Sequence, residues 1–326
     1  MVEELVISNK VAGVYLDQIG SAIPKNCWDT SHHHTLGGGS YWRQGYLQMM
    51  NKVYAAIGRT KVPLVTEDNS EVVIDIVSGL LTLNAYRSHF SFSSQYSTIL
   101  QDNDFQIIAP AYAVVYGGYY VGFGMEWFVP DFTDYNFWRA KLAISFVSGS
   151  QLGWFSLLGI ASDPEDECGP MGVGDLLLNK ENTELVVFLN TLSSARAIPS
   201  VLNFLLQGHM TRPPLLNPLP ITIQQTAGSK SPDRPILWFD TVLSSSWVSS
   251  DEKKVMIFLV GVTTDSFKTS LMVSFETMGF PVGSTVIASA ITTQGTIQYI
   301  STFKSSGTID VIVPGSDVLI LLFDVL

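Results

Sequence analysis

Two carboxylates stand where two short apolar runs of the sequence end. The run GVYLDQ ends at Asp17, and PLVTEDNSE passes through Glu67, 50 residues later. In parallel α/β folds, functional side chains lie at the C-terminal ends of strands, so we expect both carboxylates to project into one cleft. Glycoside hydrolysis uses such a pair: one carboxylate attacks or stabilises the anomeric carbon, and the other donates a proton to the leaving oxygen.

The same pair has a plainer interpretation, because acidic residues at strand ends also cap the following helix or bind water. Two features favour catalysis. A β-rich domain after a parallel α/β domain is frequent among glycosidases, which is an argument by analogy. The surroundings are also rich in aromatic, amide and imidazole side chains, on which sugar rings stack and to which they hydrogen-bond. The candidate substrate-binding residues are Tyr15, Gln18, His32, His34, Trp42, Asp68, Tyr116, Gln151 and Trp154.

Between the two carboxylates lies the stretch SHHHTLGGGSYW, residues 31–42. On an extended loop, His32 and His34 could share one side while His33 points away, and two imidazoles with a carboxylate could bind Zn²⁺. We nevertheless predict that His32 and His34 contact substrate hydroxyls, and we expect no metal and no cofactor. The glycines let the loop turn close to a ligand.

Other chemistries fit this sequence less well. The glycine triplet matches neither GxGxxG nor a phosphate-binding P-loop, and SHHHT is not the HExxH zinc motif. The GxSxG motif of serine hydrolases is absent from the sequence. The internal position of the histidine run also argues against a purification tag.

The elements that must position these residues alternate along the first part of the chain. Alternation of strands and helices predicts parallel βαβ units. We expect strands at Val11–Ile19, Val62–Thr66 and Ala109–Tyr116, with a further strand before Met125. We expect helices at Tyr41–Ile57, Glu71–Leu83, Asp134–Phe146 and Asn182–Gln207, the last broken near Pro199.

The pattern changes after Arg212. A proline-rich connector, PPLLNPLP, is followed by short apolar runs separated by turn signals, which predicts an antiparallel β-sandwich. The expected strands are Ile236–Phe239, Val255–Val262, Ser270–Phe275, Thr285–Ser289, Thr296–Phe303, Thr308–Val313 and Val318–Phe323. We therefore predict an α/β domain over residues 1–212 and a β-sandwich over 213–326. The first domain holds roughly four strand-helix units, whereas an eight-stranded barrel needs about 250 residues. Either its sheet is open or the chain holds only part of a barrel.

Composition excludes several functions. Hydrophobic residues make up 46% of the 326 residues and charged residues 14%, which allows a large core and argues against disorder. The net charge of −11 suits neither nucleic acid nor an anionic membrane surface. The two cysteines, Cys27 and Cys168, form no CxxC pair, so a disulfide and two free thiols both stay open.

Targeting signals are also weak. The start carries Glu3 and Glu4 where a secretory signal needs basic residues. The longest apolar run, Ala109–Met125, is slightly short for a membrane span. We expect no membrane span, and an acidic chain with an aromatic cleft fits an extracellular polysaccharide enzyme better than a cytoplasmic protein.

Two segments of the chain also resemble a known family. GVYLDQIGSAIPKNCWDTSHHHTLGGGSYWRQGY followed by PLVTEDNSEVVIDIVSGLL resembles a glycoside-hydrolase-like family of (β/α)8 barrels that carries a domain of unknown function and is distantly similar to endo-α-N-acetylgalactosaminidases. The motif GSQLGWF and the closing β-rich part also look similar. The resemblance begins near the fourth barrel strand and implies that Asp17 matches the nucleophile and Glu67 the acid/base.

This resemblance implies a partial (β/α)8 barrel followed by an antiparallel β-sandwich. The first hypothesis for function is a retaining glycoside hydrolase acting on a polysaccharide, oligosaccharide or glycoconjugate. The second is a non-catalytic carbohydrate-binding or structural fragment, because an incomplete barrel leaves strand edges that another segment must cover. The expected partners are a carbohydrate and the missing N-terminal part of the same protein.

Overall fold

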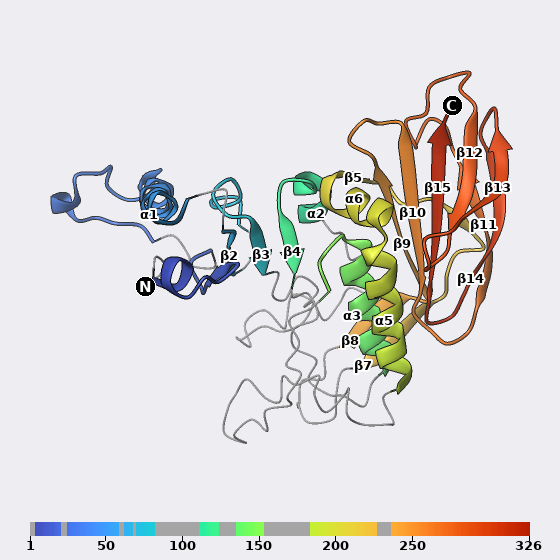
Figure 1. Cartoon of the computed structure of the whole chain (residues 1–326), viewed down its shortest axis with the longest axis horizontal. Helices are drawn as coiled ribbons and strands as arrows, with labels where there is room; N and C mark the ends of the chain where they lie inside the picture. Colours follow the sequence, from blue (N-terminus) through green and yellow to red (C-terminus); the bar gives the residue numbers. More distant parts are fainter. Residues whose placement is uncertain are drawn as a thin grey trace. The chain divides into compact units, whose positions relative to one another are not determined.

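The computed structural model describes residues 4–20, 25–58, 62–67, 70–81, 111–123, 135–152, 183–226 and 236–326. The chain forms two compact units (Figure 1). Unit 1 comprises Met1–Leu83 and Tyr119–Phe123, and unit 2 comprises Asn84–Gly118 and Gly124–Leu326.

Unit 1 is built on a four-stranded parallel sheet in the order β1-β2-β3-β4. The strands are β1 (Val14–Leu16), β2 (Leu64–Glu67), β3 (Gly79–Leu81) and β4 (Val121–Phe123). The prediction of a parallel sheet is confirmed. The two strands expected at Val11–Ile19 and Val62–Thr66 are β1 and β2, and the strand expected before Met125 is β4.

Helix α1 (Tyr41–Ile57) connects β1 to β2, and its bounds agree with the predicted helix. Its apolar residues recur at helical spacing, and Met50, Tyr54 and Ile57 are buried. The Tyr54 hydroxyl donates to the carbonyl of Ile76 at 2.8 Å. Arg43 on the same helix pairs with Asp75 at 2.6 Å, and this carboxylate raises the pKa of the guanidinium. Both bonds fix the helix to the segment that enters β3. Two short turns, η1 (Glu4–Ser8) and η2 (Thr30–His32), complete the unit.

The helix predicted at Glu71–Leu83 is wrong. Residues 71–76 form turns, and β3 follows at Gly79–Leu81. The four-residue apolar spacing imitates a helix, but the run is too short to separate a helix from a buried strand by periodicity. Gly79 decides the outcome, because a Cβ at this position would lie 2.9 Å from the carbonyl oxygen of Val121 on β4. The strand pair therefore forms only around a glycine.

The strand predicted at Ala109–Tyr116 is also wrong. Helix α2 covers Ala111–Tyr116 and belongs to unit 2. The amide of Gly117 continues the helical bonding to Ala113 at 2.9 Å, and Gly118 has a φ of +86°, which is favourable for glycine just past a helix. The apolar, β-branched composition of this run indicated a strand, but the glycine pair ends a helix.

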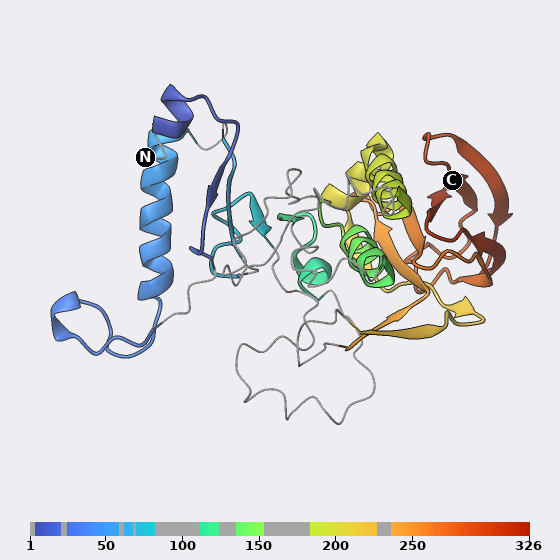
Figure 2. The same cartoon turned by 90° about the horizontal axis from the view of Figure 1, so that it is seen from below.

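Unit 2 packs helices and sheets around a six-stranded antiparallel sheet with the order β13-β12-β15-β10-β9-β5 (Figures 1 and 2). Its central strand β10 (Lys254–Gly261) is buried on both faces. On one face, Met256, Phe258 and Val260 share a core with helices α3 (Tyr135–Val147), α5 (Thr183–Ala197) and α6 (Pro199–Gln207). The rings of Phe146 and Phe258 meet edge to face at 5.3 Å. The predicted break near Pro199 is confirmed, because Pro199 is the first residue of α6.

On the opposite face, Ile257 and Leu259 of β10 share a second core with a three-stranded sheet ordered β14-β11-β6. Alternate residues of one strand therefore serve two cores. The remaining strands are β5 (His209–Thr211), β6 (Leu216–Asn217), β7 (Thr222–Thr226), β8 (Ile236–Asp240), β9 (Val242–Val248), β11 (Phe267–Val273), β12 (Val286–Ile291), β13 (Ile297–Phe303), β14 (Gly307–Val313) and β15 (Val318–Val325).

Each strand predicted after residue 235 overlaps an observed strand, so the expectation of substantial antiparallel β structure is confirmed. Strand β9 was missed, because its sequence VLSSSWV carries three serines in a row, two of which are buried. The predicted boundary at residue 212 differs from the division into compact units, since α3, α5 and α6 share a core with β10. The assignment of 1–212 to a barrel and 213–326 to a sandwich stays a prediction.

The length and composition of the helices can be compared with what a membrane span requires. Among the described residues, no single helix is long and apolar enough to cross a membrane. Helices α5 and α6 meet that criterion only when taken together, and they are bent by 81° at their junction.

Candidate active site

The two predicted catalytic carboxylates lie at the C-terminal ends of adjacent parallel strands. Leu16 on β1 pairs with Thr66 on β2, so Asp17 and Glu67, each the next residue, lie level with each other at this edge of the sheet. The Tyr15 hydroxyl donates to Asp17 Oδ1 at 3.1 Å, and the backbone amide of Gln18 donates to Glu67 Oε2 at 3.2 Å. Neighbouring strands are about 4.8 Å apart, which is the scale of a two-carboxylate site. We call Tyr15, Asp17, Gln18 and Glu67 the carboxylate edge.

Thr66, which is fully buried, holds this edge together. Its hydroxyl donates to the Leu16 carbonyl at 2.7 Å and accepts from the Gly20 amide at 2.9 Å. The chain after β1 therefore turns directly over β2. A Cβ at Gly20 would lie 2.4 Å from the carbonyl oxygen of Glu67, so this close passage requires glycine. Gln18 has a φ of +57°, an uncommon conformation for a non-glycine residue, within the same turn.

The segment Cys27–Gly37, which we call the histidine loop, is closed by its ends. The Cys27 amide donates to the Gly37 carbonyl at 3.0 Å, and the Gly37 amide donates back at 2.6 Å. Gly37 has a φ of +83°, and a Cβ there would lie 3.1 Å from the Trp28 ring, so glycine suits this position on two counts. Between the ends, Asp29 caps the start of η2, and its carboxylate accepts from the Ser31 hydroxyl at 2.7 Å and from the Ser31 backbone amide at 2.8 Å. The hydrogen bond from the Ser31 hydroxyl, followed by the one from the Ser31 amide, lowers the pKa of Asp29 below its ordinary value.

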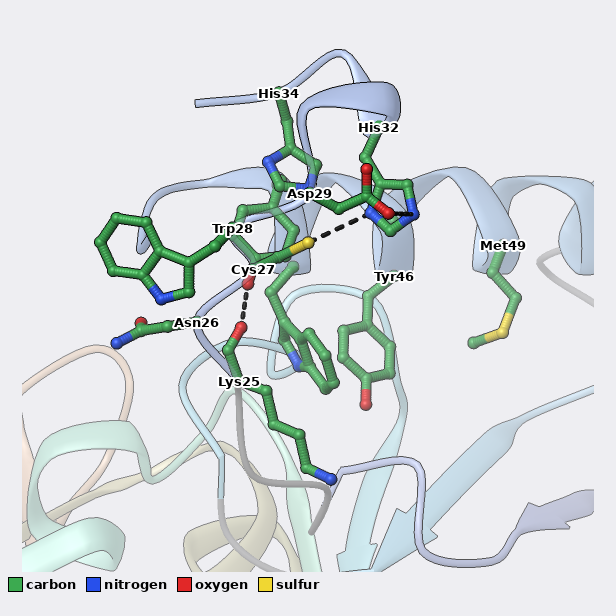
Figure 3. A pocket seen from close by; sticks show the side chains of 12 residues that line it. Lys25, Asn26, Cys27, Trp28, Asp29, His32, His34, Tyr46 and Met49 are labelled. Carbon is green, nitrogen blue, oxygen red and sulfur yellow. Dashed lines mark hydrogen bonds and ion pairs between the residues drawn. The ribbon is translucent and has the colours of Figure 1, made fainter. Parts of the chain in front are cut away.

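The histidine loop and helix α1 border an open pocket of about 750 Å³ (Figure 3). Its lining is Lys25, Asn26, Cys27, Trp28, Asp29, His32, His34, Tyr41, Trp42, Gly45, Tyr46 and Met49. Tyr46 connects this pocket to the carboxylate edge, because its hydroxyl donates to the carbonyl of Ile19 at 2.6 Å. Burial raises the pKa of this hydroxyl. The pocket thus has aromatic walls beside imidazole and carboxylate groups.

His32 and His34 lie on the same side of the loop, as predicted, but not because the loop is extended. His32 ends η2, and His33 adopts a left-handed conformation with a φ of +56°, which brings His34 back toward His32. The centroids of the His32 and His34 rings are 5.7 Å apart. The His34 ring stacks on Tyr41 at 4.1 Å, with 7° between the planes.

The other predicted substrate-binding residues lie in different parts of the structure. Trp42 lines the pocket, whereas Tyr15 and Gln18 belong to the carboxylate edge. Tyr116 and Gln151 lie in unit 2. Tyr116 ends helix α2 rather than a strand, and its ring lies 4.7 Å from that of Tyr112. Asp68 and Trp154 lie outside the described residues.

Cys27 lines the pocket, can take part in chemistry and was not among the predicted site residues. Cys27 is a free thiol, and its Sγ lies 3.1 Å from His32 Nδ1 (Figure 3). The spacing of one cysteine followed by two histidines, CxxxxHxH, was the available signal. It indicates convergence only once the loop is known to close between Cys27 and Gly37.

A family described as a domain of unknown function (DUF6259) matches residues 1–127. A protein of Monosiga brevicollis named "Putative glycoside hydrolase 22789" is 35% identical over 263 residues, which cover 80% of this chain and 21% of that protein. A "Putative glycoside hydrolase" of Bacteroides thetaiotaomicron is 28% identical over 153 residues, covering 47% of this chain and 20% of that protein. The chain therefore spans about one fifth of the length of these relatives.

Among solved structures, a maltogenic alpha-amylase of Thermotoga neapolitana matches with a TM-score of 0.50 at 13% identity. The match covers 98% of this chain and 63% of the amylase. Because the identity is only 13%, this match shows similarity of fold alone. The chain is thus similar in sequence to proteins named as glycoside hydrolases and similar in fold to a glycosidase, whereas a similarity to endo-α-N-acetylgalactosaminidases rests on the sequence resemblance alone.

Proposed function

We propose that the protein to which this chain belongs is a retaining glycoside hydrolase, with Asp17 as nucleophile and Glu67 as acid/base. One observation carries the proposal: the two carboxylates end adjacent parallel strands at the same level of the sheet. The similarity to proteins named as glycoside hydrolases supports it. Exposed acidic residues alone are common, but a level pair at the ends of adjacent parallel strands, about 4.8 Å apart, is on the scale of the carboxylate spacing of retaining enzymes.

In this mechanism a carboxylate oxygen of Asp17 attacks the anomeric carbon while Glu67 gives its proton to the departing glycosidic oxygen. A water molecule then attacks the same carbon, Glu67 takes a proton from it, and Asp17 leaves as a carboxylate. The hydrogen bond from the Tyr15 hydroxyl holds one oxygen of Asp17 in place and so orients its carboxylate. The backbone amide of Gln18 holds one oxygen of Glu67, which orients the carboxylate for proton transfer.

The pocket beside α1 supplies the walls of the proposed sugar site. Trp42 and Trp28 offer flat apolar faces, and aromatic rings are the usual stacking partners of sugars. The bond from Tyr46 to Ile19 ties this wall to the strand end that carries Asp17. We infer that sugar units next to the cleaved bond lie along this surface. Tyr116, Gln151, Asp68 and Trp154 stay candidates for further contacts.

We further propose that the four parallel strands are part of a (β/α)8 barrel that precedes an antiparallel β-sandwich. Within the described residues β1 pairs with β2 alone, so its other edge is where additional barrel strands would add. Since the relatives are about five times longer than the match, the activity is assigned to the whole protein. The sequence resemblance makes an α-N-acetylgalactosaminide the first substrate to test.

The test is hydrolysis of a panel of aryl glycosides by the full-length protein and by two variants, Asp17→Asn and Glu67→Gln. We expect Asp17→Asn to reduce kcat about 10³-fold or more on the best substrate. Glu67→Gln should reduce kcat/KM, which reports the first step, about 10²–10⁴-fold on substrates with poor leaving groups. On dinitrophenyl glycosides, whose leaving group needs no proton, kcat/KM should fall much less, while kcat still falls because the second step lacks its base. Glu71→Gln, an exposed carboxylate four residues further on, is the matched control and should keep full activity.

The edge position of β1 also favours a second candidate, a carbohydrate-binding or structural module without catalysis of its own. It predicts that the chain binds oligosaccharides and that no glycoside is hydrolysed, even by the full-length protein. Unchanged hydrolysis in both carboxylate variants would instead show that the catalytic pair lies elsewhere.

A further inference from the structure

Three side chains of the histidine loop converge without any role in the proposed hydrolysis. Cys27, His32 and His34 each offer one ligand atom, and these atoms all lie within 4.8 Å of one another. A tetrahedral zinc ion, with sulfur at about 2.3 Å and nitrogen at about 2.0–2.1 Å, holds such atoms roughly 3.3–3.6 Å apart. Small rotations about the side-chain bonds would therefore bring all three to an ion. We propose that Cys27, His32 and His34 form a zinc site.

The outer partners of the two histidines fit this proposal. The His34 Nδ1 lies 2.8 Å from the carbonyl oxygen of Thr35, which can only accept, so Nδ1 carries the proton and Nε2 is left as the ligand atom. His32 Nε2 faces Asp29 Oδ2 at 3.4 Å, while its Nδ1 faces the thiol. A carboxylate behind a histidine and a carbonyl behind another are the usual outer contacts of zinc-bound imidazoles, and they fix ring orientation.

The backbone supports the same geometry. The two hydrogen bonds between Cys27 and Gly37 close the loop at its base, so the thiol is brought back under the histidines. The left-handed His33 reverses the chain between the two ligands and leaves its own ring out of the cluster. Stacking on Tyr41 holds the His34 ring on α1. A thiolate with two imidazoles favours zinc over the hard cations Ca²⁺ and Mg²⁺, which prefer oxygen ligands.

Three protein ligands leave a fourth position for water or another oxygen ligand, as in zinc sites that bind small molecules. All three ligands line the 750 Å³ pocket, so this position is open to it (Figure 3). The site thus goes beyond the proposed hydrolysis, and it replaces the predicted role of His32 and His34 as hydroxyl partners. Its existence does not depend on whether Asp17 and Glu67 are catalytic.

The experiment measures zinc bound to the metal-stripped chain after equilibrium dialysis against Zn²⁺. We expect one zinc ion per chain. Cys27→Ser, His32→Gln and His34→Gln should each weaken binding by about 100-fold or more, beyond the 10–100-fold typical of an outer partner. His33→Gln is the matched control, because it removes a histidine that is outside the cluster, and it should bind zinc as the unaltered chain does. The proposal would be overturned if each of the three ligand variants bound zinc as tightly as the unaltered chain. It would also be overturned if His33→Gln weakened binding as much as the ligand variants do.

Cobalt provides a second readout that separates a lost ligand from a lost fold. Co²⁺ added to the metal-stripped chain should give the thiolate charge-transfer band and the intense visible bands of a tetrahedral site. The charge-transfer band should vanish in Cys27→Ser and persist in Cys168→Ser, while the circular dichroism spectra of both variants match the unaltered chain. A thiolate band that follows Cys168, or no band at all, would contradict the assignment. Neither readout requires hydrolysis, so a failure here leaves the proposed function standing, and the reverse also holds.

Discussion

The carboxylate edge and the histidine loop belong to the same unit but are built in opposite ways. At the carboxylate edge, regular strands set the positions, since the pairing of Leu16 with Thr66 places Asp17 and Glu67 at one level. In the histidine loop, irregular backbone sets them, through a left-handed His33 and a bridge between Cys27 and Gly37. The first arrangement follows from topology, and the second follows from local turns. The two regions should therefore respond differently to substitution.

The largest expected effect separates the two regions by activity. Asp17→Asn in the full-length protein should lower kcat about 10³-fold or more while leaving zinc binding unchanged, because Asp17 is not a ligand of the proposed metal site. Steady-state kinetics and zinc dialysis on the same preparation check both halves of this statement. A joint loss of hydrolysis and zinc would show that the two regions form one site.

Asp29→Asn should have the next largest effect, on the histidine loop alone. Removing the charge behind His32 should weaken zinc binding about 10–100-fold, since outer carboxylates orient and polarise the ligand imidazole. Isothermal titration with Zn²⁺ measures this change, with His33→Gln as the control. Unaltered affinity would mean that Asp29 only caps the short turn η2.

Thr66→Val should affect the carboxylate edge through its backbone. The variant keeps the shape of the side chain but leaves the Leu16 carbonyl and the Gly20 amide without their partner, which should cost about 1–3 kcal/mol of stability. Denaturant unfolding measures the loss, and a lowered kcat would show that the edge needs this support. Stability within experimental error of the unaltered chain would contradict the role given to Thr66.

The smallest expected effect is that of a substitution at Gly45, which we compare with one at Gly20, a second glycine of unit 1. Gly20→Ala should destabilise the carboxylate edge, because its Cβ would meet the Glu67 carbonyl at 2.4 Å. Gly45→Ala, in the second turn of α1 with nothing within 4 Å of its Cβ, should instead stabilise the chain by about 1 kcal/mol. Thermal unfolding of both variants compares a glycine that the structure requires with one that it does not. Destabilisation by Gly45→Ala would show that the space beside α1 is filled.

Positions set by regular strands and helices could be predicted from the sequence, whereas positions set by irregular backbone could not. The rule that functional residues follow parallel strands led to Asp17 and Glu67, and the structure places both at the ends of adjacent parallel strands. Their roles in catalysis stay a prediction. Helix α1 was predicted from its periodic apolar face. The rule failed at Ala111–Tyr116, where a strand-like run forms helix α2, and so Tyr116 does not end a strand.

The convergence of Cys27 with His32 and His34 was beyond such rules. It depends on a single left-handed residue and on two hydrogen bonds between residues ten positions apart. A pattern of apolar residues carries no information about either. The double burial of β10 was similarly invisible, because an unbroken apolar run does not reveal which core each side chain enters.

Trapping the covalent intermediate tests the central claim most directly. The full-length protein is incubated with a fluorinated analogue of its best aryl glycoside substrate, which slows release of the enzyme-bound sugar, and is then digested and analysed by mass spectrometry. We predict one sugar per chain, attached to the peptide that contains Asp17, and no label in Asp17→Asn. A label on a different carboxylate, or hydrolysis that inverts the anomeric configuration without any covalent label, would contradict the assignment of Asp17 as nucleophile.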